Sequence, residues 1–165
     1  DKGVSFEFAN NEKIKQSGFA LEGKTVNGFV KDGSITLNVE SNQMLEKVAG
    51  HEITHVLEGT ELYSALQQAV KEYATAKGEY DSRLQALTEL YKGVENTNVE
   101  NELTADLVGE YLFTDEYFVK NLSVKDQKLF QRIFSEIKYM LKAATAGSAD
   151  CQLKRSPVPY SAVRL

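Results

Sequence analysis

Residues 42–57 carry the sequence NQMLEKVAGHEITHVL, in which apolar side chains recur at helical spacing. At about 100° per residue, Leu45 and Ile53 fall on one broad face of a helix, which we expect to pack on the core. His51 and His55 are four residues apart, so their side chains share one flank of that face. The chain contains two histidines, and this one turn holds both of them.

The same turn places Glu52 beside His51, which gives the pattern H-E-x-x-H. Two imidazoles at this spacing can bind one metal ion, and the glutamate between them can reach a water molecule held by that ion. The pattern also occurs by chance, so the alternative is a pair of ordinary histidines on a helix surface. Because both histidines lie on one amphipathic stretch, we expect His51 and His55 to bind zinc.

A third ligand has to come from elsewhere in the chain. Catalytic zinc usually takes three ligands from the protein, and without a third histidine the remaining one would be a carboxylate or the lone cysteine, Cys151. A predicted helix over residues 98–113 offers Glu102 and Asp106, which are four apart and share a face. The rest of this helix is largely apolar, and a buried acidic stripe needs a partner such as a metal ion. The alternative is a solvated acidic face, which Glu110 would continue.

The H-E-x-x-H helix and the later sequence NELTAD, at residues 101–106, together resemble the signature of the gluzincins, the thermolysin-like zinc metallopeptidases. The resemblance covers roughly residues 29–113. It implies that Glu102 is the third zinc ligand and that Asp106 accepts a hydrogen bond from the other ring nitrogen of His51. A metal-bound imidazole usually donates that N–H to a carboxylate, which fixes its tautomer.

The resemblance also implies an activity. A zinc ion held by these residues would activate a water molecule, Glu52 would act as the general base, and a peptide bond would be hydrolysed. The expected partner is therefore a peptide or protein substrate. The chain further resembles metallopeptidase-like domains embedded in large proteins of phages and mobile elements. Because it also begins with Asp1 rather than methionine, we expect it to be part of a larger polypeptide.

Two departures from the family pattern leave other functions open. The spacing between His55 and Glu102 is longer than in compact gluzincins. No histidine follows the second motif to stabilise an oxyanion, which leaves Tyr111, Tyr117 and Tyr139 as candidates. The main alternative is a non-catalytic zincin-like module for interaction or assembly. A structural metal site is a further alternative, and it would need a fourth protein ligand.

The sequence predicts an α+β fold of the zincin type, with a small antiparallel N-terminal sheet packed on a mainly helical body. Polar and apolar residues alternate over residues 4–8, and Asp32 and Gly33 supply the tight turn of a hairpin. In gluzincins the strand before the motif helix lies along the cleft as an edge strand, and Ile35–Val39 occupies that place in the chain. Further helices are predicted over residues 60–77, 79–92 and 124–146. We expect one domain over residues 1–150 and an irregular tail over residues 151–165.

The composition constrains the binding partners and the cellular compartment that we expect for this protein. The net charge of −5 without a basic cluster argues against binding to nucleic acid. No apolar run approaches the roughly 20 residues that cross a membrane. A single cysteine cannot form an internal disulfide, and the chain opens without a signal-peptide pattern. These features favour the cytoplasm.

Overall fold

The computed structural model describes residues 4–18, 25–95 and 97–146 of the chain. In this part of the chain a three-stranded sheet and seven helices form a mixed α+β fold that is mostly helical. The strands are β1 (Ser5–Ala9), β2 (Gly28–Lys31) and β3 (Ser34–Asn38). The helices are α1 (Asn11–Gln16), α2 (Leu45–Leu57), α3 (Glu61–Ala76), α4 (Tyr80–Leu90), α5 (Val99–Thr114), α6 (Glu116–Lys125) and α7 (Gln127–Ala146).

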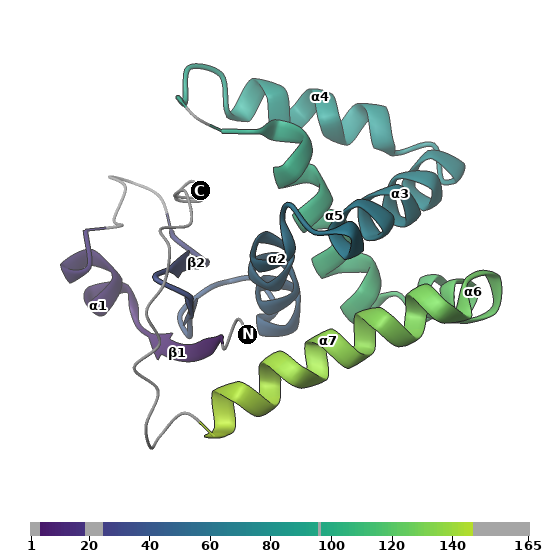
Figure 1. Ribbon diagram of the computed structural model, residues 1–165. Helices are drawn as coiled ribbons and strands as arrows, with labels where there is room; N and C mark the ends of the chain where they lie inside the picture. Colours follow the sequence, from purple (N-terminus) through teal and green to yellow (C-terminus); the bar gives the residue numbers. More distant parts are fainter. Residues whose placement is uncertain (1–3, 19–24, 96, 147–165) are drawn as a thin grey trace.

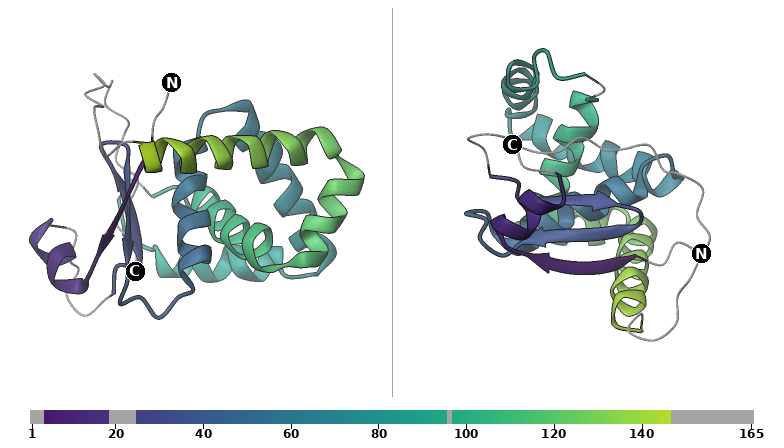
Figure 2. Two further views of the ribbon diagram at one scale, coloured as in Figure 1. Left: turned by 90° about the horizontal axis from the view of Figure 1, so that it is seen from below. Right: turned by 90° about the vertical axis from the view of Figure 1, so that its left-hand side faces the viewer.

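The elements form layers around α2. Figure 1 shows α2 between the sheet and the other long helices. The left view of Figure 2 shows the sheet nearly edge-on, with α1 on one side and the helices from α2 onward on the other. The motif helix therefore packs directly on the sheet, where it contacts β2 and β3, while α7 contacts β1.

The hairpin forms where the sequence predicts it. Asp32 and Gly33 both adopt positive φ angles, 49° and 74°, as a two-residue turn between antiparallel strands requires. This turn sets the register in which Val30 of β2 lies opposite Ile35 of β3. Ile35 is fully buried, and its face of the sheet packs on α2.

The sheet differs from the prediction in two respects. Its order is β1-β3-β2, and β1 pairs with β3 in parallel, with Phe6 opposite Ile35, so the sheet is mixed rather than antiparallel. β3 is therefore the central strand of the described sheet, and the prediction that residues 35–39 form an edge strand is wrong. The parallel pairing joins strands that α1 and β2 separate in the chain, and an alternating pattern carries no information about such a long-range neighbour.

Most of the helices lie close to their predicted positions. The predicted ranges 60–77, 79–92 and 98–113 correspond to α3, α4 and α5. The short helices α1 and α6 are not predicted from the sequence. The last helix begins later than predicted because Asp126 ends α6 and accepts a hydrogen bond from the backbone N–H of Leu129 at the start of α7.

The core is centred on the crossing of α2 and α5. The two helices approach closely at Gly50 and Gly109, and a Cβ on Gly109 would overlap the backbone carbonyl oxygen of Lys47. This close approach brings the histidine-bearing flank of α2 against the acidic face of α5. The largest fully buried side chains of the core to which this crossing belongs include Tyr111, Ile35, Leu66, Leu103, Leu107 and Ile133.

Two further expectations concern a membrane span and the C-terminal tail. Among the described residues, the helices are too short or too polar to serve as a membrane span. The expected end of the domain at residue 150 and the tail over residues 151–165, with Cys151, lie outside the described residues.

Candidate metal centre

Helix α2 carries its motif on the buried side. His51 and His55 are each 7 % exposed, and Glu52 is 3 % exposed. The helix ends at Leu57, two residues after the second histidine, and the backbone then turns away through a glycine with a φ of +78°, Gly59. The motif therefore occupies the last turns of α2, where this helix meets α5.

His51, His55 and Glu102 bring three potential ligand atoms together from α2 and α5. All of these atoms lie within 4.8 Å of one another, and all three residues are buried. The Nε2 atoms of the two histidines are 3.3 Å apart, and Nε2 of His55 is 4.0 Å from Oε1 of Glu102. Ligand atoms about 2.0–2.1 Å from a tetrahedral zinc ion lie roughly 3.3 Å from one another. The imidazoles therefore already have the spacing of a zinc pair, and a small inward movement of Glu102 would complete the group.

Asp106 lies behind His51. Its Oδ1 atom is 2.6 Å from Nδ1 of His51, on the side of the ring opposite the nitrogen that faces His55. A carboxylate in this position keeps a proton on Nδ1 and leaves the lone pair of Nε2 for a metal. The contact is the one that the family resemblance implies for these two residues.

The other two potential ligands have outer partners that the motifs do not predict. Nδ1 of His55 contacts Oε1 of Glu58, three residues further along the chain. The hydroxyl of Tyr91 donates a hydrogen bond of 3.2 Å to Oε2 of Glu102, whose Oε1 atom faces His55. Each of the three potential ligands thus has a polar side chain behind it. The spacing of Glu58 from His55 is a signal that the sequence contains, because residues at i and i+3 share a helix face.

The electrostatics of the group favour a cation. Burial raises the pKa of Glu52 to about 8, and the carboxylates of Glu102 and Asp106 add to this shift, whereas His55 opposes it. Burial also raises the pKa of Glu102 to about 7. When no cation is present, Glu52 is therefore mostly protonated near neutral pH, and Glu102 exchanges its proton in the same pH range. A dication among them would compensate the buried negative charge.

Strand β2 passes close to the candidate metal group at Gly28, next to Glu52. A Cβ on this residue would lie 2.9 Å from Cγ1 of Val48 and 3.2 Å from Cγ of Glu52. A larger residue would therefore push against the side chain of Glu52. The strand that adjoins Glu52 is thus β2, which is an outer strand in the described sheet order, and not the central strand β3.

The structure does not bring the tyrosines considered for stabilising an oxyanion into contact with the potential metal ligands through any of the hydrogen bonds described here. Tyr111 is fully buried and donates its hydroxyl hydrogen bond to Glu79. Tyr117 is 78 % exposed on α6, and Tyr139 is 43 % exposed on α7. The tyrosine whose hydroxyl does reach a potential ligand is Tyr91. No motif spacing marks it, because it lies in the connection between α4 and α5.

The acidic face of α5 serves two purposes. Glu102 and Asp106 belong to the candidate metal group, as described above. Glu110 instead accepts two hydrogen bonds from Arg83, of 2.8 and 3.0 Å, and lies 3.4 Å from Nζ of Lys47. The acidic stripe is therefore divided between the candidate metal group and a set of ion pairs that joins α5 to α4 and α2.

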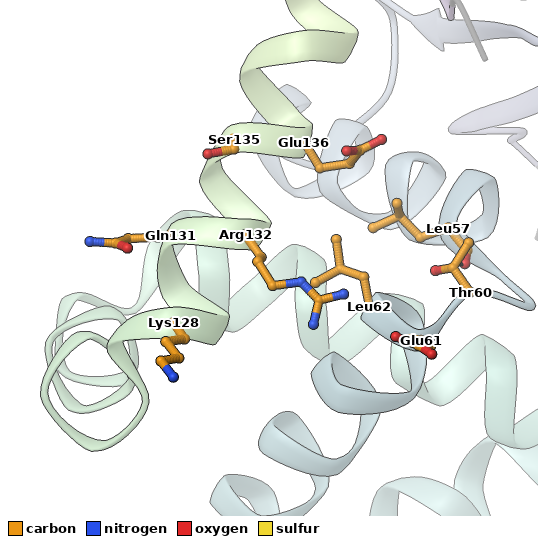
Figure 3. A pocket seen from close by; sticks show the side chains of 9 residues that line it. All are labelled: Leu57, Thr60, Glu61, Leu62, Lys128, Gln131, Arg132, Ser135 and Glu136. Carbon is orange, nitrogen blue, oxygen red and sulfur yellow. Dashed lines mark hydrogen bonds between the residues drawn. The ribbon is translucent and has the colours of Figure 1, made fainter. Parts of the chain in front are cut away.

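A separate hollow of about 730 Å³ lies between α7 and the turn that joins α2 to α3. Figure 3 shows Arg132 of α7 reaching across it toward Leu62 of α3. Neither the potential ligands nor Glu52 line this hollow. Chemistry at the metal group would therefore take place elsewhere.

Comparisons of the chain with protein-family models, with curated proteins and with solved structures find no match. The likeness to gluzincins therefore rests on the two motifs. The structure supports its coarser part, which is a buried His-His-Glu group that could hold a metal ion.

Proposed function

We propose that this chain is a zinc-dependent peptidase that hydrolyses peptide bonds with Glu52 as general base. The observation that carries the proposal is the convergence of His51, His55 and Glu102, with Glu52 buried beside them. Catalytic zinc usually takes three ligands from the protein, whereas structural zinc takes four. The order of the two motifs, H-E-x-x-H and then N-E-x-x-x-D, adds the resemblance to metallopeptidases.

Zinc is the metal that best suits this donor set. Two imidazole nitrogens and one carboxylate oxygen are typical zinc ligands, whereas magnesium and calcium prefer sets of oxygen atoms. The Nε2 atoms of His51 and His55 also have the spacing of tetrahedral zinc ligands. When bound, zinc would supply Lewis acidity to a water molecule and to a carbonyl oxygen.

Glu52 would move the proton. Its carboxylate takes a proton from the attacking water as the water oxygen bonds to the carbonyl carbon. It then gives this proton to the amine nitrogen as the C–N bond breaks, which leaves a carboxylic acid and an amine. Burial raises the pKa of Glu52 when no cation is present, and a dication beside it would favour the carboxylate again, so that Glu52 could accept the proton and later release it. Asp106 keeps the ring of His51 oriented throughout.

The proposal predicts that Glu52→Gln retains zinc and loses turnover. Glutamine has nearly the same size but cannot accept the proton, and general acid–base catalysis contributes about 10²–10⁴-fold to a rate. Cleavage of a peptide library by the zinc-loaded proteins, together with zinc content by elemental analysis, measures both effects. Glu46→Gln is the matched control because Glu46 lies on the same helix with an exposed side chain.

Two results would contradict the proposal in different ways. Full activity of Glu52→Gln would remove Glu52 from the role of general base. A wild-type protein that binds zinc stoichiometrically and cleaves no peptide would instead favour the non-catalytic module.

A further inference from the structure

We propose that Glu58 is a positioning residue for His55 and that Asn101 acts through Glu58. The orientation of the second imidazole would then be set jointly by the end of α2 and the start of α5. The inference rests on the metal centre of the proposed function, but it concerns the binding of the metal and not the cleavage of a peptide.

Glu58 reaches His55 because of the way α2 ends. The backbone N–H of Glu58 still donates to the carbonyl oxygen of His55, at 3.2 Å, so Glu58 remains one helical turn beyond the histidine. Its own backbone then leaves the helix with a ψ of 140°, and Gly59 completes the turn. In this position Oε1 of Glu58 contacts Nδ1 of His55 while Nε2 of the same ring faces His51.

Asn101 engages the other oxygen of the same carboxylate. Its Nδ2 atom donates a hydrogen bond of 3.1 Å to Oε2 of Glu58. With one oxygen on His55 and the other on Asn101, the plane of the Glu58 carboxylate is fixed. Asn101 directly precedes Glu102, so this chain of contacts connects the second potential ligand to the helix that carries the third.

The chemistry of the contact selects one tautomer. A carboxylate on Nδ1 stabilises the ring form that carries its proton on Nδ1 and presents the Nε2 lone pair to a metal. Without Glu58, a neutral His55 can place its proton on either nitrogen, and one of these forms cannot bind the metal through Nε2. The expected consequence is a weaker metal site with an altered tautomer of this one ring.

Nitrogen NMR of the metal-free protein tests the tautomer directly. The chain has two histidines, so a long-range ¹⁵N–¹H spectrum contains two imidazoles that His51→Ala and His55→Ala assign. At a pH where both rings are neutral, we expect His55 of the wild type to carry its proton on Nδ1. Glu58→Ala should shift His55 toward a mixture of tautomers and leave His51 unchanged. Glu58→Gln should keep the Nδ1–H form, because its amide oxygen still accepts a hydrogen bond.

Zinc affinity provides the second measurement. Loss of an outer partner of a metal-bound histidine typically weakens metal binding about 10–100-fold, and we expect Glu58→Ala to fall in this range in competition with a chromophoric chelator. Asn101→Ala should have a smaller effect. The double variant should bind zinc as Glu58→Ala does, because Asn101 has nothing to act on once Glu58 is absent. Glu46→Ala, an exposed position on α2, is the control.

The outcomes separate this inference from the proposed function. A Glu58→Ala protein with the wild-type tautomer and the zinc affinity of the Glu46→Ala control would overturn the role of Glu58. Effects of the two substitutions that simply multiply would overturn the link through Asn101. Should Glu58→Ala fail to fold, Glu58→Met would test the contact by the same two measurements, because its side chain has a similar length but no oxygen to accept the Nδ1 proton of His55. Wild-type protein that binds zinc but cleaves no peptide would refute the peptidase and leave the positioning role intact.

Discussion

At the scale of single residues, Glu52 combines deep burial with a carboxyl group that burial keeps protonated in the metal-free protein. Its pKa is about 8 in the folded protein, against 4.5 for an ordinary glutamate. Between these two values the folded state binds more protons than the unfolded state, so the free energy of unfolding falls as the pH rises. Well below pH 4.5, Glu52 is protonated in both the folded and the unfolded state. The free energy of unfolding then no longer depends on the ionisation of this group.

Glu52→Gln should therefore stabilise the metal-free protein at neutral pH. The amide is uncharged without taking up a proton on folding, and we expect a gain in unfolding free energy of roughly 3 kcal/mol at pH 7, declining to nearly zero at pH 4. Chemical denaturation of the metal-free proteins from pH 4 to pH 8 measures this difference. Glu46→Gln should follow the wild type at every pH. Parallel curves for Glu52→Gln and the wild type across the whole range would show that Glu52 ionises normally.

The site residues that the sequence predicts are those that helix geometry alone brings together. His51 with His55, and Glu102 with Asp106, each stand at i and i+4, so any helix over these stretches places them on one face. Tyr91 is different because it lies in a connection between helices. Its hydrogen bond to Glu102 depends on the path of that connection in space, which no local spacing encodes.

At the scale of elements, the crossing of α2 and α5 decides how closely the histidines approach Glu102. A Cβ on Gly109 would overlap the backbone carbonyl oxygen of Lys47, and a Cβ on Gly50 would lie 2.5 Å from the ring of Phe113. A backbone oxygen cannot move away without shifting its helix, whereas a ring at the helix surface can turn or be replaced. The two glycines therefore limit the distance between the helices in different ways.

Gly109→Ala should destabilise the protein by pushing α2 away from α5. We expect a loss of roughly 1–3 kcal/mol in unfolding free energy, although alanine is the better helix former by about 1 kcal/mol. Zinc affinity should fall as well, since the two helices supply different ligands. Thermal and chemical denaturation measure the first effect, and chelator competition measures the second.

Gly50→Ala provides the comparison, because its obstacle is a side chain. Phe113→Leu should restore most of the stability lost in Gly50→Ala and none of that lost in Gly109→Ala. A Gly109→Ala protein as stable as the wild type, with unchanged zinc affinity, would show that the crossing tolerates a wider spacing.

The elements themselves were predictable to different degrees. Long amphipathic stretches predict α2 and α3, and a long, largely apolar stretch predicts α5, which is buried on most sides. The Asp-Gly pair predicts the β2–β3 hairpin. The short helix α6 depends on a local cap, in which Asp115 accepts hydrogen bonds from the backbone N–H groups of Tyr117 and Phe118. The parallel pairing of β1 with β3 depends on residues far apart in the chain. Periodicity describes a single element, so it could not reveal either of these.

At the scale of the whole molecule, the candidate metal group lies where two parts of the fold meet. α2 packs on β2 and β3, whereas α5 packs on α3, α4 and α6 as well as on α2. His51 and His55 come from the first of these helices, and Glu102 comes from the second. A bound ion would therefore bridge the helix that covers the sheet and the central helix of the helical body.

This bridging predicts that metal removal lowers the melting temperature of the entire domain. A ligand at 100 times its Kd stabilises the folded state by about 2.7 kcal/mol, which corresponds to a shift of roughly 5–10 °C for a chain of this size. Calorimetry of the wild type with added zinc, and again with excess chelator, measures the shift. His51→Ala and His55→Ala each remove one ligand, so their melting temperatures should no longer respond to zinc. A wild-type melting temperature that is the same with zinc and with chelator would mean that no ion joins the two helices, because any ion bound only by the folded state must stabilise it.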